Sequence, residues 1–341
     1  MSVLRAILLV AAALLLAAAA QSEARRIWID SDAACDGAAR HDPDDCLAVY
    51  ALAASGEIRI VGVSSVFGNV GETESRETLH GMATALAGDG IAFPNAFPGA
   101  GKPFHRQAPP AESEAQLALC QALDEAPLTV VALGPLTNIA AAMTACPDLT
   151  GQIERIVFVG GRREGHVFHP AEDAMPRARL GHGPIFRDLN VELDRDAASQ
   201  VLTSGVALTL VPYELARKLE LTGADLDAFA ERGAAADDIA ANSRNWLAWW
   251  QADVGREGFY PFDLMAAAVI LTPEAFVCVT SHASVRRDAM ISLFGNLRVL
   301  LFALPPDGTA TRPIETCLTF SHNGRELVRQ LITGSQEESA T

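Results

Sequence analysis

The chain has 341 residues, of which half are apolar and a fifth are charged, a composition typical of a globular protein and not of a disordered chain, a collagen or a coiled coil. Asp and Glu outnumber Lys and Arg by 42 to 26, which gives a formal net charge of −16. So acidic a chain is a poor match to the nucleic-acid backbone or to anionic lipid, and it suits a bound cation or a neutral small molecule.

The first twenty residues have the pattern of a secretory signal peptide. Arg5 precedes an unbroken apolar run over 6–17, and three alanines then supply a cleavage site. The run is short for a bilayer span, no later apolar stretch is long enough to be one, and no cysteine at the cleavage site indicates a lipid anchor. We therefore expect removal of residues 1–20, export to the periplasm or the medium without a membrane anchor, and a single domain over 21–341.

Apolar strand-like segments alternate with helical segments along the rest of the chain. In chain order the pattern predicts strand 26–30, helix 43–54, strand 58–66 (buried on both faces), helix 72–87, strand 128–133, helix 136–144, strand 156–159, helix 197–204 and strand 206–211. Strands separated by helices predict an α/β fold with an open, mostly parallel sheet flanked by helices. Residues 285–319, around a turn at 305–308, alternate as antiparallel strands do, and a closing helix is predicted over 325–332.

Six cysteines in an exported chain allow up to three disulfides. Their order along the chain favours three pairs of neighbours: Cys35–Cys46, Cys120–Cys146 and Cys278–Cys317. Six cysteines nevertheless allow fifteen pairings, and some could be buried free thiols. None of them shows the close spacing of a zinc site.

Carboxylates gather where the first predicted strand ends and the first helix begins. Asp30 and Asp32 follow the strand, and Asp44 and Asp45 fall in the first turn of the helix. Ligands of open parallel sheets bind beyond the carboxyl ends of the strands, so these side chains are expected at one rim. Four carboxylates in a partly dry cleft repel one another unless some are protonated, point apart or share a cation. A hard divalent cation is the economical explanation, and Ca²⁺ suits such an oxygen-rich site outside the cytosol.

Helix capping is the alternative explanation for part of this acidic group. Asp42 is a plausible N-cap with Pro43 at the first helical position, and carboxylates in the first turn complement the helix dipole. Taken alone, an Asp-Pro-Asp-Asp run before a helix is more often capping than catalysis.

Six blocks in a fixed order resemble the inosine-uridine nucleoside hydrolase family, Ca²⁺-dependent N-ribohydrolases with an open α/β fold. The resemblance covers essentially the whole mature chain. The first block is split here, because its two halves are separated by eight more residues than in the family. The blocks are Asp30-Ser31-Asp32 with Asp44-Asp45-Cys46-Leu47-Ala48, then 62–69 ending in Gly68-Asn69, 132–140, Phe158-Val159-Gly160-Gly161, Asp188-Leu189-Asn190 and 261–267 with Phe262-Asp263.

The resemblance implies a role for each matching position. The Ca²⁺ ligands would be the carboxylates of Asp32, Asp45 and Asp263 and the backbone carbonyl of Leu133, with Asp32 also the general base for the attacking water. Ribose hydroxyls would be held by Asp44, Asn69, Asp188 and Asn190, and His182 falls near a family position that contacts ribose. Asp30 would support the site without binding metal. For Asn69 and Asn190 taken singly, a turn-forming role is equally compatible with the sequence.

The base-binding side departs from part of the family, since Phe262 stands where broad or pyrimidine-preferring members often carry His. An aromatic residue there resembles the purine-specific branch, in which stacking on the purine raises its basicity. Three indoles upstream could extend that stack or could be core packing: Trp246, Trp249 and Trp250. Three histidines in the long segment 166–183 could supply an acid or be solvated: His166, His169 and His182.

The sequence thus predicts an exported Ca²⁺-dependent enzyme that hydrolyses the N-glycosidic bond of ribonucleosides, with a preference for purines. The resemblance also implies a homodimer or homotetramer acting on a small-molecule nucleoside. Two alternatives remain open. An exported nucleoside- or sugar-binding protein could keep the fold without turnover, in view of the lengthened segment 33–43 and Phe262. A phosphohydrolase using Asp30 or Asp32 as nucleophile would need basic side chains to hold the phosphate. The chain has only two lysines, Lys102 and Lys218, and neither lies in a suitable block.

Overall fold

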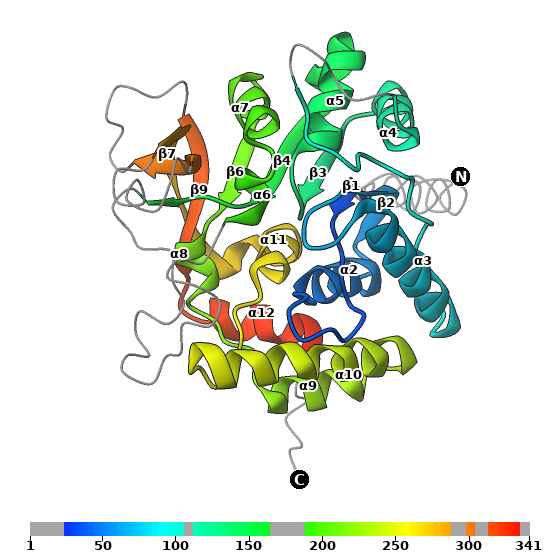
Figure 1. Cartoon of the computed structure of the whole chain (residues 1–341), viewed down its shortest axis with the longest axis vertical. Helices are drawn as coiled ribbons and strands as arrows, with labels where there is room; N and C mark the ends of the chain where they lie inside the picture. Colours follow the sequence, from blue (N-terminus) through cyan, green and yellow to red (C-terminus); the bar gives the residue numbers. More distant parts are fainter. Residues whose placement is uncertain (1–23, 106–111, 164–187, 288–297, 304–312, 335–341) are drawn as a thin grey trace, which may run out of the picture.

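The structure is a computed structural model that describes residues 24–105, 112–163, 188–287, 298–303 and 313–334. Its described strands form one nine-stranded sheet with helices against both faces (Figure 1). The strands are β1 (Arg25–Ser31), β2 (Ile58–Ser65), β3 (Leu128–Ala132), β4 (Ile153–Val159), β5 (Arg162–Arg163), β6 (Leu208–Val211), β7 (Phe276–Arg287), β8 (Arg298–Ala303) and β9 (Pro313–Phe320). The predicted fold class is confirmed.

Helices cover the sheet, and they include the five that the sequence predicted. The α-helices are α2 (Asp44–Ala54), α3 (Glu72–Gly88), α4 (Glu114–Glu125), α5 (Thr137–Ala145), α6 (Leu189–Glu192), α7 (Arg195–Thr203), α8 (Tyr213–Ala216), α9 (Gly223–Ala230), α10 (Ala234–Trp249), α11 (Phe262–Leu271) and α12 (Gly324–Thr333). The five predicted helices are present as α2, α3, α5, α7 and α12, whereas the other six described helices had not been predicted. Short helical turns add η1 (Pro147–Gln152), η3 (Trp250–Val254) and η4 (Pro273–Ala275). In the described part of the chain, no helix is both long and apolar enough to cross a bilayer.

The strand order is β2-β1-β3-β4-β6-β9-β7-β8-β5, and the pairs from β2 through to β9 are all parallel. β7 is antiparallel to both β9 and β8, which confirms the expected antiparallel part. β9 therefore pairs in parallel on one side and antiparallel on the other. The turn expected at 305–308 lies outside the described residues.

Alternate residues of the central strands point into two separate cores, as in a sheet covered on both faces. Ile27 and Ile29 of β1 lie in the core formed with α2, α10 and α11, whereas Trp28 between them lies in the core formed with α4, α5 and α7. The prediction that strand 58–66 is buried on both faces was wrong for its first half. β2 is the edge strand of the sheet, and the side chains of 58–61 are only partly covered or are exposed.

All six cysteines form disulfides, in the three pairs that their order favoured. Cys120–Cys146 joins α4 to the end of α5, and Cys278–Cys317 joins the antiparallel neighbours β7 and β9. The remaining pair, Cys35–Cys46, ties the long segment after β1 to the first turns of α2. The expected signal peptide over 1–20 lies outside the described residues.

Candidate active site

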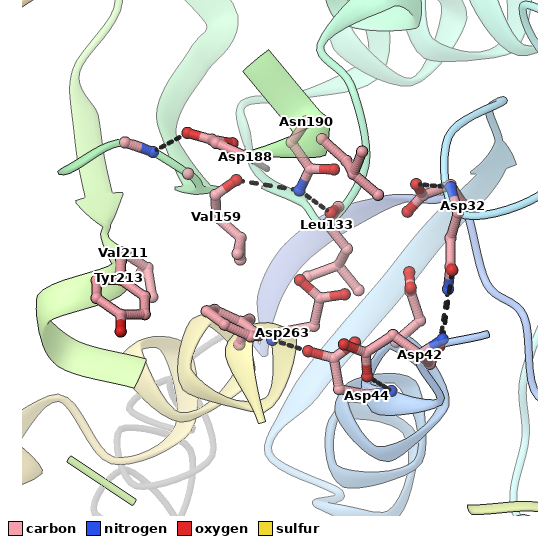
Figure 2. Close-up of a pocket in the computed structure, with 16 residues that line it drawn as sticks. Asp32, Asp42, Asp44, Leu133, Val159, Asp188, Asn190, Val211, Tyr213 and Asp263 are labelled. Carbon is pink, nitrogen blue, oxygen red and sulfur yellow. Dashed lines mark hydrogen bonds between the residues drawn. The ribbon is translucent and has the colours of Figure 1, made fainter. Parts of the chain in front are cut away.

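A pocket opens at the carboxyl ends of the central parallel strands, and most of the predicted site residues lie in it (Figure 2). Of the ten residues singled out from the sequence, His182 lies outside the described residues together with His166 and His169. The other nine all line this pocket: Asp32, Asp44, Asp45, Asn69, Leu133, Asp188, Asn190, Phe262 and Asp263. They come from six widely separated segments, which the parallel sheet brings to one edge.

The acidic floor of the pocket is built where the N-termini of two buried helices meet. Asp44 and Asp45 lie in the first turn of α2, and Asp263 lies in the first turn of α11. The Oδ2 atom of Asp44 accepts a hydrogen bond of 2.9 Å from the backbone N–H of Asp263, so each helix start stabilises the other. The positive ends of both helix dipoles favour anionic side chains at this point. Nine of the ten residues of α11 are buried, which fixes its position against α2.

Three carboxylates on this floor are close enough to share one metal ion. One oxygen each of Asp44, Asp45 and Asp263 lie within 4.8 Å of one another, and all three residues are buried. The family resemblance placed Asp32 in the metal ligand set and Asp44 with the ribose, whereas the structure brings Asp44 into the closest carboxylate group. Three carboxylate oxygens are the donor set that a hard divalent cation prefers.

Asp32 lies at the opposite side of the pocket floor and is 3 % exposed. Its Oδ2 atom accepts a hydrogen bond of 2.6 Å from the backbone N–H of Asn69. Two glycines allow the neighbouring loops to approach it. A Cβ atom at Gly68 would lie 1.8 Å from Oδ2 of Asp32, and one at Gly134 would lie 3.0 Å from Oδ1. The glycines of two predicted blocks therefore have a steric role, namely to admit this carboxylate.

Burial and mutual repulsion raise the proton affinity of this cluster. The pKa of Asp45 is raised from 3.8 to about 7, first by burial and then by the charge of Asp44. The pKa of Asp32 is raised well above its usual value by burial and by the charge of Asp45. Burial and the neighbouring carboxylates, Asp44 first among them, likewise raise the pKa of Asp263. A bound cation would lower all three pKa values, because it favours the charged form.

The far wall of the pocket carries Asp188 and Asn190, the N-cap and the second residue of α6. Asp188 accepts hydrogen bonds from the backbone N–H groups of Gly161, at 2.7 Å, and Val191, at 3.3 Å. Burial raises the pKa of Asp188 to about 6. The side-chain amide of Asn190 donates to the carbonyl of Leu133, at 2.5 Å, and to that of Val159, at 3.1 Å. Leu133 thus lines the pocket with its carbonyl hydrogen-bonded to the side chain of another lining residue, Asn190.

Asp30 lies beneath the pocket and is not among its lining residues. Its Oδ1 atom accepts hydrogen bonds from the Ser64 hydroxyl, at 2.5 Å, and from the Asn138 amide, at 2.7 Å. Asn138 also donates to the carbonyl of Ser65 and accepts from the backbone N–H of Ala100. Asp30 therefore holds β1, β2 and α5 together below the site.

Two flat aromatic rings form the remaining wall. Phe262 and Tyr213 both line the pocket, with ring centroids 6.5 Å apart and planes inclined by 23°. Two possibilities had been left open for the three indoles, extension of this stack or core packing. Trp246 and Trp250 are buried in the core, Trp249 packs on Trp246, and none of them is among the described residues that line the pocket. Core packing, the alternative explanation, is what the structure shows.

Two pocket residues had been given no place in the site on the basis of the sequence. Tyr213 follows β6 after Pro212, so the rule that ligands bind at strand ends could have indicated it. Asp42 had been considered only as an N-cap, which was wrong. α2 begins at Asp44 with Pro43 at the N-cap position, and the Asp42 carboxylate accepts a 3.3 Å hydrogen bond from the N–H of Asp44 while facing the pocket.

Comparison with known proteins agrees with this geometry. The sequence model of the family described as inosine-uridine preferring nucleoside hydrolase matches residues 27–312. The chain belongs to this family. Uridine nucleosidase 1 of Arabidopsis thaliana is 24 % identical to this nucleoside hydrolase over 256 residues, which cover 68 % of the chain and 72 % of the relative. The pyrimidine-specific ribonucleoside hydrolase RihA of Salmonella paratyphi B is 26 % identical over 69 % of the chain and 78 % of its own length.

The fold of this nucleoside hydrolase is shared by solved structures. A plant nucleoside hydrolase superimposes with a TM-score of 0.69 at 20 % identity, over 92 % of the chain and 100 % of that structure. Members of the family are metal-dependent N-ribohydrolases, and the buried group of Asp44, Asp45 and Asp263 is consistent with a metal site. The pocket is thus the candidate active site of an enzyme that hydrolyses ribonucleosides.

Proposed function

We propose that this nucleoside hydrolase is a Ca²⁺-dependent enzyme that releases free base and ribose from ribonucleosides, with a preference for purines. The observation that carries the proposal is that four buried carboxylates, those of Asp32, Asp44, Asp45 and Asp263, line one pocket, with Asp32 set apart from Asp44 and Asp263 (Figure 2). One side of the pocket floor can hold a hard cation, and the other side can accept a proton.

The donor set fits Ca²⁺ better than a softer or smaller ion. It consists of carboxylate oxygens from Asp45, Asp263 and Asp44 or Asp32, with the carbonyl of Leu133, which lines the same pocket. Ca²⁺ accepts six to eight such oxygens in irregular geometry, whereas Mg²⁺ demands a nearly ideal octahedron. When bound, Ca²⁺ would supply a site that orients water and the ribose hydroxyls and increases the acidity of that water.

Asp32 is the proposed general base. It is buried, and its Oδ2 atom is fixed by the N–H of Asn69, so its remaining oxygen lone pairs face the pocket without freedom to rotate away. Burial raises the pKa of Asp32 toward neutral pH, and a general base works best when its pKa lies near the operating pH. Asp188 and Asn190 on the far wall would orient the ribose and, through the charge of Asp188, favour the positive charge that develops on the sugar.

The purine preference rests on the wall of Phe262 and Tyr213. Two stacked rings present a broad apolar face, which a two-ring base covers more fully than a single pyrimidine ring does. Among the described residues that line the pocket there is no Lys or Arg, so the only charged side chains that a nucleotide phosphate would meet on this lining are carboxylates. This lining favours neutral nucleosides as substrates.

Release of ribose tests the proposal. The chain from residue 21 onward is incubated with inosine, adenosine, guanosine, uridine and cytidine, in Ca²⁺ and after chelation, and reducing sugar is measured. We expect release that requires Ca²⁺ and that falls by about three orders of magnitude in Asp32→Asn. Asp227→Asn, which removes an exposed charge paired with Arg244, is the matched control and should leave the rate unchanged. Nucleoside binding without release would instead indicate a binding protein, and phosphate release from nucleotides a phosphohydrolase.

We further propose that the protein is exported, since its six cysteines all form disulfides, which persist in oxidising compartments. The periplasm or the medium also supplies the Ca²⁺ that the site would need. Sequencing the N-terminus of the protein secreted by expressing cells tests this, and a start at residue 21 is expected.

A further inference from the structure

The segment 33–43, which separates the two halves of the first family block, carries one more carboxylate into the active site. Asp42 lines the pocket together with Asp44 and Asp263, and its side chain is turned toward them (Figure 2). The proposed reaction gives this residue no task so far. The Asp42 carboxyl group accepts a hydrogen bond of 3.3 Å from the N–H of Asp44, and this long contact contributes too little to offset the repulsion from the neighbouring carboxylates.

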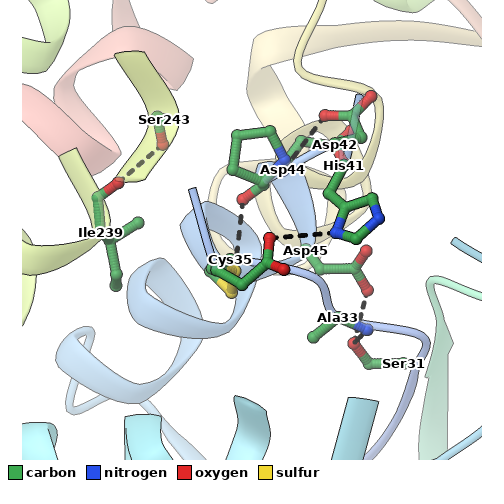
Figure 3. Close-up of a disulfide and its surroundings, with 12 residues drawn as sticks. Ser31, Ala33, Cys35, His41, Asp42, Asp44, Asp45, Ile239 and Ser243 are labelled. Carbon is green, nitrogen blue, oxygen red and sulfur yellow. Dashed lines mark hydrogen bonds and ion pairs between the residues drawn. A yellow bond between two sulfur atoms is a disulfide. The ribbon is translucent and has the colours of Figure 1, made fainter. Parts of the chain in front are cut away.

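The inserted segment is anchored at three points along its length. The disulfide Cys35–Cys46 ties its start to α2 (Figure 3). The carbonyl of Gly37, in its middle, accepts a 2.7 Å hydrogen bond from the Asn245 amide on α10. A segment held in this way presents its last residues in a defined position, which a substrate contact requires.

The third anchor is Asn69, and it acts on Asp42 itself. The Asn69 amide donates to the carbonyl of Asp42 at 2.8 Å and its oxygen accepts from the N–H of Asp42 at 3.3 Å. Both ends of the Asn69 side chain are thus engaged with the Asp42 backbone. The residue that the resemblance assigned to the ribose therefore holds Asp42 in place, and Asp42 presents the acceptor oxygens.

We infer that Asp42 is an additional substrate-binding residue, which accepts a hydrogen bond from one ribose hydroxyl, and that Asn69 is its positioning residue. The inference rests on the proposed nucleoside hydrolysis. A carboxyl group offers an acceptor oxygen whether or not it is ionised, and the hydroxyls are the only hydrogen-bond donors that the ribose offers. Because the segment is inserted relative to the family pattern, this contact is a specificity feature of this chain.

The test compares Asp42→Ala, Asp42→Asn and Asn69→Ala with the wild type, at saturating Ca²⁺. Asp36→Asn is the matched control, since Asp36 lies in the same segment with its side chain 40 % exposed and outside the pocket. The expected loss in kcat/KM for inosine is about 10- to 100-fold in Asp42→Ala, the range for a hydrogen bond to a charged group. Asp42→Asn keeps one acceptor oxygen and should recover part of that loss. Asn69→Ala should lower kcat/KM in the wild type but have little further effect in Asp42→Ala.

The hydroxyl is identified with 2′-, 3′- and 5′-deoxyinosine, used as substrates or, where turnover is too slow, as competitive inhibitors. For the analogue that lacks the contacted hydroxyl, the ratio of kcat/KM (or of inhibition constants) between wild type and Asp42→Ala should fall to nearly one. For the other two analogues the ratio should stay as large as it is for inosine. An equal ratio for all three analogues would overturn the inference, as would a loss that higher Ca²⁺ restores or one that Asp36→Asn reproduces. An inactive wild type would instead refute the proposed function itself.

Discussion

The geometry around Asp32 makes the substitution Gly68→Ala a sensitive test of the site. A Cβ atom at position 68 would lie 1.8 Å from Oδ2 of Asp32, whereas ordinary contacts begin at 3.4 Å. The carboxylate or the loop must therefore move by more than 1 Å. Asp32 cannot move freely, because the N–H of Asn69 holds the same oxygen and the loop at Gly134 closes the other side.

A displacement of this size is expected to lower kcat/KM for the best nucleoside by about 100-fold, because misplacing a catalytic group by 1 Å has that order of effect. Gly71→Ala is the matched control. It lies three residues further along the same turn, has a φ of −68°, and has nothing within 4 Å of an added Cβ. Both variants are assayed for ribose release, and their melting temperatures are compared.

The reasoning would be refuted if Gly68→Ala retained kcat/KM within about threefold of Gly71→Ala. It would also be refuted if the two variants lost activity equally, since the effect would then come from the turn and not from Asp32. A loss confined to Gly68→Ala, with the fold intact by circular dichroism, is the expected outcome.

Two further predictions concern the acidic floor and the aromatic wall. In chelator, the free energy of unfolding should fall as the pH rises from about 4 to about 7, because the raised pKa of Asp45 makes the folded chain bind more protons than the unfolded chain in that window. Saturating Ca²⁺ should abolish this fall. Melting temperatures measured across the pH window in chelator and in Ca²⁺ test the prediction, and two parallel curves would show that no cation binds at this site. Phe262→Leu should lower kcat/KM for inosine about tenfold more than for uridine, since it removes half of the aromatic wall. Equal losses for the two substrates would show that the wall does not select purines.

Local patterns in the sequence were enough to predict the fold class. The helices and parallel strands that were predicted lie within a few residues of those observed, because alternation and helical periodicity reflect backbone geometry that each segment adopts by itself, but six shorter or later helices were missed. Chain order favoured the disulfide pairing that the structure shows without excluding the other pairings, and the short separation of Cys35 and Cys46 is one reason why it did. The rule for strand ends placed Asp32, Asp44 and Asp45 at one rim, and the family resemblance supplied most of the other residues that line the pocket.

Which side chains face one another across that rim was decided by the tertiary structure alone. The contact of the N-termini of α2 and α11 placed Asp44 beside Asp263, 219 positions along the chain. Anchors on α2, α10 and Asn69 turned Asp42 toward the pocket, and packing kept the indole of Trp250 in the core. Such orientations depend on neighbours that are distant in sequence, so no local sequence pattern predicts them. These same orientations determine the distances between the carboxylates of the site.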